Sequence, residues 1–125
     1  MLELDANFLV AVLRGDTRAT NLAEGWLLRN EDIVMSAIAW SELLCGPLTG
    51  EEKERARLIV SRIEPFTADD ATLAADLFNK TGRRSRSHAD CMIAAAAIRR
   101  GSILATLDRP GFERFERFQL RLEVA

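Results

Sequence analysis

Apolar residues occur along the chain in short runs that alternate with longer segments of helical spacing. The short runs Leu2–Leu4, Ile33–Met35 and Ser102–Thr106 are candidates for buried strands. A more loosely alternating segment, Gln119–Glu123, is a candidate for an edge strand. Short apolar strands separated by helices favour a parallel sheet that helices cover on its faces. The pattern therefore predicts an α/β fold.

The longer segments have apolar residues at helical spacing, and capping residues or chain breakers mark several of their ends. The pair Gly46-Pro47 is a strong breaker, and Thr67 with Asp70 resembles a capping box at the start of a helix. We expect helices from about Ala6 to Gly15, from Asp16 or Thr17 to about Asn30, from Ile38 to Leu44, over Thr49–Arg62, from Thr67 to about Lys80, and over Cys91–Arg100.

The segments between and after these helices are less regular. Thr81–Ser87 is basic and is expected to be a flexible loop, and Asp108–Gly111 is expected to form a turn. Phe112, Phe115 and Phe118 are spaced by three residues, which favours a short helix packed against the body of the protein.

The 125 residues are the usual length of one domain, and the hydrophobic content of 48% favours a packed globule. We therefore expect a single domain over residues 1–125. Met1–Leu4 lacks the basic start of a signal peptide, and no apolar run reaches the length of a membrane span. Cys45 and Cys91 lie in apolar sequence and are expected to be reduced core residues. These features predict a cytoplasmic protein.

The formal net charge of -2 argues against a protein that holds nucleic acid by bulk positive charge. If the protein cuts nucleic acid, the negative charge of its acidic site must be neutralised locally. A divalent cation is the natural candidate for that role.

Four acidic residues are candidates for one site. Asp5 and Asp108 each follow a predicted strand, and the carboxyl ends of parallel strands meet at one edge of a sheet. Glu42 lies in an otherwise apolar helix, and Asp90 lies near the start of a later helix. Each also has a structural interpretation: Asp5 as an N-cap, Glu42 as a solvated helix residue, Asp90 in a capping box with Ser87, and Asp108 as a turn residue.

Taken together, the four carboxylates suit a metal site. Clustered carboxylates repel one another unless cations neutralise them, and oxygen-only ligands select Mg²⁺ or Mn²⁺. Such ions polarise a phosphodiester and lower the pKa of a bound water. The chemistry that this set predicts is the hydrolysis of a phosphodiester bond.

Three stretches of the sequence resemble the motifs of PIN-domain nucleases, and specifically of VapC-type toxins. LELDANFLVAVLRG resembles the first motif, in which a strand ends in Asp and is followed by x-Asn and an apolar helix. SAIAWSELLCG resembles the second motif, with its helical Glu. HADCMIAAAAIRRGSILATLDRPGFERF resembles the last two motifs, in which an Asp opens a helix and Thr-x-Asp follows a strand. The motifs occur in the family's order at compatible spacing.

The resemblance implies a three-layer α/β/α PIN-like fold with a central parallel sheet. It implies that Mg²⁺, or Mn²⁺, is bound by Asp5, Glu42, Asp90 and Asp108 as metal-binding and catalytic residues. The resemblance also implies that Asn7 supports Asp5 and that the hydroxyl of Thr106 helps to orient the site. It also implies an endoribonuclease toxin that is held inactive by a cognate antitoxin, and that forms a homodimer, or a heterotetramer or larger assembly with the antitoxin.

Two positions depart from the family pattern. Ala6 follows Asp5 where the family often has a hydroxyl residue, and Gly111 stands where the family frequently has Asp or His. Asp108 is thus the only acid of the last motif, and operation with one metal ion stays open as an alternative to two.

Several other residues have both a functional and a structural interpretation. The basic cluster Arg83, Arg84 and Arg86 lies beside the third motif and is a candidate nucleic-acid contact, or else a solvated loop. His88 is the only histidine and is expected to be an ordinary loop residue, since one histidine cannot make a zinc site. The two tryptophans, at positions 26 and 40, are expected to pack in the core or against a partner.

Three other functions remain as alternatives. A PIN-type RNA-processing nuclease that is not a toxin would carry the same acids. A catalytically degenerate PIN-like binding module should have lost one or more of them. A phosphatase with Asp5 as nucleophile would need a second Asp two residues later, where this chain has Asn7.

Overall fold

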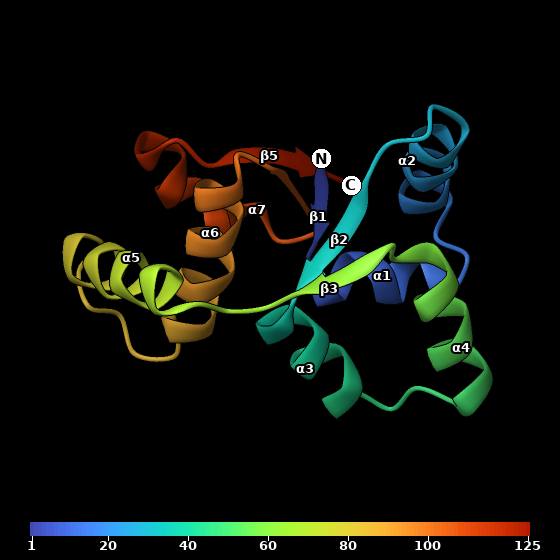
Figure 1. The fold of residues 1–125 in the computed structure, drawn as a ribbon, viewed down its shortest axis with the longest axis horizontal. Coiled ribbons are helices and arrows are strands. Elements are labelled where there is room, and N and C mark those ends of the chain that lie inside the picture. The colour runs from blue at the N-terminus through green and yellow to red at the C-terminus, as the bar shows by residue number, and fades with distance from the viewer.

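Five parallel strands form the centre of the computed structural model, which describes residues 1–125 (Figure 1). Across the sheet the strands run in the order β3-β2-β1-β4-β5, and every neighbouring pair is parallel. The strands are β1 (Leu2–Leu4), β2 (Ile33–Ser36), β3 (Arg62–Glu64), β4 (Ile103–Thr106) and β5 (Arg121–Val124).

Helices cover both faces of this sheet. Figure 1 shows α1, α2 and α4 on one side and α5 and α6 on the other, while α3 extends from the end of β2 and contacts both α1 and α6. The expected three-layer α/β/α fold is confirmed. The helices are α1 (Ala6–Leu13), α2 (Thr17–Leu28), α3 (Ala37–Cys45), α4 (Gly50–Ile59), α5 (Ala68–Lys80), α6 (His88–Arg100), α7 (Arg109–Phe112) and the 3₁₀ helix η1 (Glu113–Phe118). None of them combines the length and apolar character of a membrane-spanning helix.

The core lies between the sheet and the two helical layers. Strands β1 and β2 are buried along their whole length, as are the side chains of Ala94–Ala97 in α6. Small alanine side chains allow a helix to lie close against a sheet. Glu3, a buried acid of β1, is paired with Arg100 through Oε1···Nη2 and Oε2···Nε contacts of 2.5 and 3.2 Å.

The predicted caps hold the starts of several helices. Asp5 accepts a hydrogen bond from the backbone N–H of Ala6, and Asp16 caps α2 by accepting from Ala19. Thr67 and Asp70 form the expected capping box, because each side chain accepts a hydrogen bond from the backbone N–H of the other residue.

The helix expected over Thr49–Arg62 is shorter than predicted. It ends at Ile59, and Arg62–Glu64 instead forms the edge strand β3, which pairs with β2. The sequence gives no strand signal here, because the strand has a single apolar residue and Arg62 is exposed. The charge pattern of the preceding residues instead favours continuing the helix. Arg62 bridges to Asp32 and Glu64, which fastens the strand to the sheet.

Three smaller expectations were also wrong. Ser87 does not cap α6 with its side chain; its hydroxyl donates to the carbonyl of Arg84 at 2.7 Å, and the helix begins at His88. Asp108–Gly111 is not an open turn, since Asp108 caps the short helix α7. Cys45 is exposed rather than buried, whereas Cys91 is in the core.

Candidate active site

The neighbouring strands β1 and β4 bring Asp5 and Asp108 to the same edge of the sheet. Leu4 is in register with Ala105, and the backbone N–H of Asp5 donates to the carbonyl of Ala105 at 2.9 Å. Asp5 therefore lies level with the carboxyl end of β4. Asp108 follows two residues after that end. Ligand sites of parallel sheets lie at this edge.

Thr106 connects the two segments through its side chain. Its buried hydroxyl donates to Oδ2 of Asp5 at 2.8 Å and accepts from the backbone N–H of Asp108 at 3.0 Å. Asn7 is placed alongside, because its Oδ1 accepts from the backbone N–H of Leu107 at 3.2 Å and lies 3.3 Å from the Thr106 hydroxyl. Thr106 and Asn7 thus connect Asp5 to the segment that follows β4 through hydrogen bonds.

Asp5 is the most buried of the four acids. Burial raises the pKa of its carboxyl, while the hydrogen bonds from Thr106 and Ala6 oppose the shift and the charge of Asp108 adds to it. A carboxylate that is desolvated and faces another acid gains from a cation in its neighbourhood.

Glu42 extends from α3, which Ser36 starts by accepting a hydrogen bond from the backbone N–H of Ala39 at 3.1 Å. Although Glu42 is largely exposed, partial desolvation raises the pKa of its carboxyl, and the charges of Asp5 and Asp90 raise it further. The side chain is therefore within electrostatic reach of two of the other acids.

Asp90 lies half-buried in the first turn of α6. Burial, and after it the charge of Asp5, raises the pKa of Asp90 to about 6, while the guanidinium of Arg114 opposes the shift and Asp108 adds to it. The capping-box interpretation of Asp90 does not hold, because Ser87 makes no such bond. Its carboxyl is thus available to the site.

Asp108 is exposed, and its carboxylate turns towards the start of α7. Oδ1 accepts from the backbone N–H of Gly111 at 3.0 Å, and a side chain at position 111 would overlap this carboxylate. The departure at Gly111 is therefore linked to the orientation of Asp108, since only glycine leaves the space that the carboxylate fills.

The four acids face one another electrostatically but do not form a complete metal site in this arrangement. The charge of another acid of the set contributes to the raised pKa of Asp5, of Glu42 and of Asp90. No group of three or more His, Cys, Asp or Glu side chains lies close enough together to hold an ion. The donor set still fits Mg²⁺ or Mn²⁺, because it consists of carboxylates alone and nothing basic pairs with Asp5.

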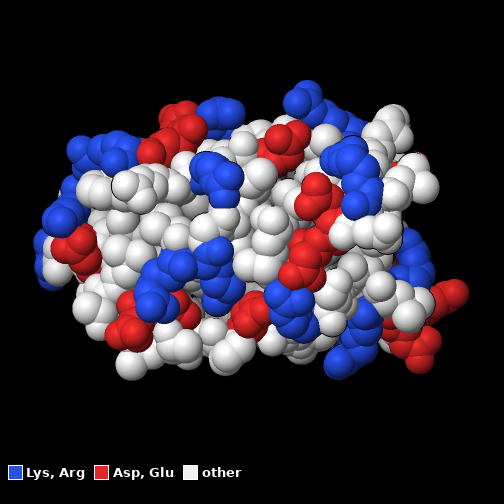
Figure 2. Space-filling view, turned by 45° about the horizontal axis from the view of Figure 1, so that its top comes forward, with Lys and Arg blue, Asp and Glu red and all other residues white.

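The predicted basic cluster does not act as a unit. Arg83 packs over the ring of Phe78 and donates to Asn79, whereas Arg84 and Arg86 line separate pockets. Figure 2 shows basic and acidic side chains interspersed over one face of the protein, rather than one continuous basic surface.

One charged residue near the site was missed by the sequence analysis. Arg114, on η1, is the basic group that lowers the pKa of Asp90 against the effect of burial. Its position depends on how η1 packs against α7 and β5, and the ERFERF segment carries no pattern that distinguishes Arg114 from Arg117.

The family model of the PIN domain matches residues 2–117 of the chain. A search of curated protein sequences gave no significant match. The family match spans all four acids, and it confirms the resemblance that the sequence motifs indicate.

Solved structures of the same fold cover nearly the whole chain. FitAcB from Neisseria gonorrhoeae has a TM-score of 0.74 and 25% sequence identity, covering 98% of this chain and 96% of that chain. VapBC2 from Rickettsia felis, bound to a DNA fragment from their promoter, has a TM-score of 0.76 and 21% identity, with coverage of 99% and 98%.

A third structure, VapC20 from Mycobacterium tuberculosis, is described as a sarcin-ricin loop cleaving toxin. It has a TM-score of 0.65 and 21% identity, and it covers 89% of this chain and 92% of that chain. Similarity at 21% identity supports the fold, and the family model covers most of the sequence. The chain therefore belongs to the PIN-domain family.

Proposed function

We propose that this protein is a Mg²⁺- or Mn²⁺-dependent endoribonuclease and the toxin of a toxin–antitoxin pair. The observation that carries the proposal is the mutual influence of four acids: Asp5 and Asp108 follow the neighbouring strands β1 and β4, and the charge of Asp5 contributes to the raised pKa of both Glu42 and Asp90. Three of these acids have a raised pKa, and another member of the set contributes to each shift.

The four acids would hold the metal, and the surrounding residues would orient them. When bound, the ion would polarise the scissile phosphodiester and lower the pKa of an attacking water. Thr106 fixes the Asp5 carboxylate through its hydroxyl, and Asn7 holds the backbone that follows β4. Such hydrogen-bonded supports orient ligands and are commonly worth about 10- to 100-fold in metal affinity or activity.

The RNA substrate and the antitoxin come from the similarity to known toxins. VapC20 is described as a toxin that cleaves the sarcin-ricin loop, and other similar structures are VapBC and FitAB complexes. By analogy, we propose that this protein forms a homodimer and binds a cognate antitoxin in a heterotetramer or larger assembly. The retained acids favour an active nuclease over a degenerate binding module. An RNA-processing nuclease would use the same site, so the site cannot separate the two functions. Growth inhibition on expression is expected only of a toxin.

The test is induced expression in a bacterial host, followed by growth measurement and sequencing of RNA 5′ ends. Asp5→Asn is expected to abolish both growth arrest and the new RNA ends. Asp16→Asn is a matched control, because Asp5 and Asp16 both cap helices and Asn keeps a cap at either position. Coexpression of the cognate antitoxin should restore growth.

New RNA ends without growth arrest would favour a processing nuclease over a toxin. Identical growth arrest and RNA ends with Asp5→Asn would contradict the ribonuclease proposal.

A further inference from the structure

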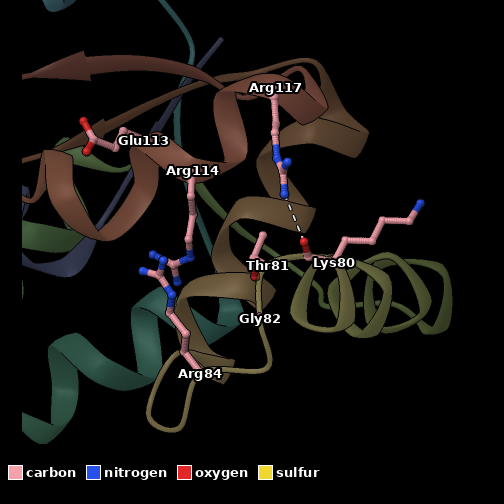
Figure 3. Close-up of a pocket in the computed structure, with 7 residues that line it drawn as sticks. All are labelled: Lys80, Thr81, Gly82, Arg84, Glu113, Arg114 and Arg117. Atoms are coloured by element: carbon pink, nitrogen blue, oxygen red, sulfur yellow. Dashed lines mark hydrogen bonds between the residues drawn. The ribbon is translucent and has the colours of Figure 1, made fainter.

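A basic pocket of about 400 Å³ lies between the end of α5, the loop before α6 and the 3₁₀ helix η1 (Figure 3). No hydrophobic residue lines it, and four of its lining residues are basic, which favours an anionic ligand. Its lining residues are Lys80, Thr81, Gly82, Arg84, Glu113, Arg114 and Arg117.

Two arginines face one another across this pocket. Figure 3 shows the side chains of Arg84 and Arg114 pointing towards each other from the loop and from η1, while Lys80 and Glu113 extend away. Arg84 is exposed and makes no ion pair or side-chain hydrogen bond. Like charges that face one another repel, and an anion between them removes that repulsion.

Arg114 and Arg117 are held in place at the side of the pocket. Arg117 donates to the carbonyl of Lys80 at 2.9 Å, and Arg114 donates to the carbonyl of Gly111 and lies over the ring of Phe115. The guanidinium of Arg114 uses Nη1 for its hydrogen bond to Gly111, while Nη2 makes no hydrogen bond within the protein. Nη2 therefore keeps N–H donors for a ligand oxygen.

The same arginine connects the pocket to the acidic site. Arg114 is close enough to Asp90 to oppose the rise in the pKa of that carboxyl. With the acids neutralised by the divalent ion of the proposed function, a ligand that spans the acidic site and the pocket would present two neighbouring anionic groups. Successive phosphates of a nucleic-acid strand have this property, and a guanidinium matches a phosphate with paired hydrogen bonds.

We infer that Arg84 and Arg114, with Arg117 beside them, bind a backbone phosphate of the RNA next to the phosphate that is cleaved. This inference rests on the proposed ribonuclease function; it keeps Arg84 from the predicted basic cluster and adds Arg114 and Arg117 in place of Arg83 and Arg86. Arg83 is outside the set, because Phe78 and Asn79 already engage its side chain.

RNA binding tests this with the cleavage-deficient Asp5→Asn protein and a short fluorescent single-stranded RNA. Binding is followed by fluorescence anisotropy over a range of salt concentrations. Adding Arg84→Ala should weaken binding about tenfold at low salt and reduce the slope of log K against log salt by about 1. Arg114→Lys keeps the charge but loses the paired geometry, so it should weaken binding as well.

Arg29→Ala is the matched control, since Arg29 is exposed, ends α2 on the other side of the sheet, and neither lines this pocket nor forms an ion pair. It should bind RNA as the parent does. Binding by Arg84→Ala and Arg114→Lys that equals the control would overturn the inference and leave an acidic partner segment as the pocket's occupant. Failure of the ribonuclease function shows itself separately, as an inability of the protein with Asp5 intact to cleave this RNA.

Discussion

The hydroxyl of Thr106, the last residue of β4, donates to Oδ2 of Asp5 at 2.8 Å, and Asp5 directly follows the neighbouring strand β1. The hydroxyl oxygen of Thr106 also accepts a hydrogen bond from the backbone N–H of Asp108. One buried side chain therefore sets the position of two acids. The Thr-x-Asp pattern after β4 thus has a physical explanation in this chain.

Replacing Thr106 with Val keeps the shape of the side chain but removes this hydroxyl. We expect kcat/KM for RNA cleavage to fall about 10- to 100-fold, because Asp5 loses one of its two donors and the N–H of Asp108 loses its acceptor. Thr106→Ser should retain most of the activity. Kinetics of RNA cleavage at several Mn²⁺ concentrations measure the effect, and equal rates for the Val and Ser variants would contradict it.

Gly111→Ala should disturb Asp108. The added methyl group overlaps the Asp108 carboxylate, which must turn away and lose its hydrogen bond from the N–H of residue 111. Loss of this cap should cost about 1 kcal/mol of unfolding free energy, and cleavage should slow. Gly50→Ala is the control, since its methyl group would enter open space at the start of α4. Urea denaturation that gives the same stability for both variants would count against this account of Gly111.

The raised pKa of Asp90 makes stability depend on pH. Burial, and then the charge of Asp5, raises the pKa from 3.8 to about 6, so the folded protein holds a proton that the unfolded chain has already released. The ionised carboxylate therefore destabilises the fold increasingly as pH rises through this range, and its effect disappears below the unfolded pKa.

Without divalent ions, Asp90→Asn should raise the free energy of unfolding by on the order of 1 kcal/mol near pH 7.5, after allowance for solvent screening. It should have little effect near pH 4. Glu31→Gln removes one exposed negative charge and should change stability little at either pH. Denaturation curves in EDTA measure this, and a gain for Asp90→Asn that is the same at both pH values would exclude titration of Asp90 as its cause.

Divalent ions should reverse this destabilisation. At about 100 times its dissociation constant, an ion that binds only the folded state stabilises it by about 2.7 kcal/mol, which raises Tm by several degrees. Asp5→Asn and Asp90→Asn should reduce the shift in Tm with Mn²⁺, whereas Asp16→Asn should leave it unchanged. A shift of full size in all three variants would place the ion elsewhere on the protein.

The sequence was sufficient to predict the strands β1, β2 and β4 and the meeting of Asp5 with Asp108. The reason is that buried strands have a clear apolar pattern, and parallel strands align their carboxyl ends. Strand β3 could not be predicted, because Arg62–Glu64 is an edge strand that depends on pairing with β2 and on ion pairs rather than on burial.

The details of the site depended on tertiary structure. Capping preferences suggested that Ser87 engages the start of α6, but its hydroxyl binds the carbonyl of Arg84 instead. The orientation of Asp108 follows from the short helix α7, and the place of Arg114 follows from the packing of η1. None of these arrangements has a period or spacing that local sequence would show.

The most direct test of the acidic site is cleavage of one defined RNA by the purified protein. Wild type and Asp16→Asn should cleave it in Mg²⁺ or Mn²⁺ and stop in excess EDTA, while Asp5→Asn and Asp90→Asn should lose at least about 100-fold in rate. Cleavage that persists in EDTA, or at full rate in Asp5→Asn, would contradict the claim that these carboxylates bind the catalytic ion.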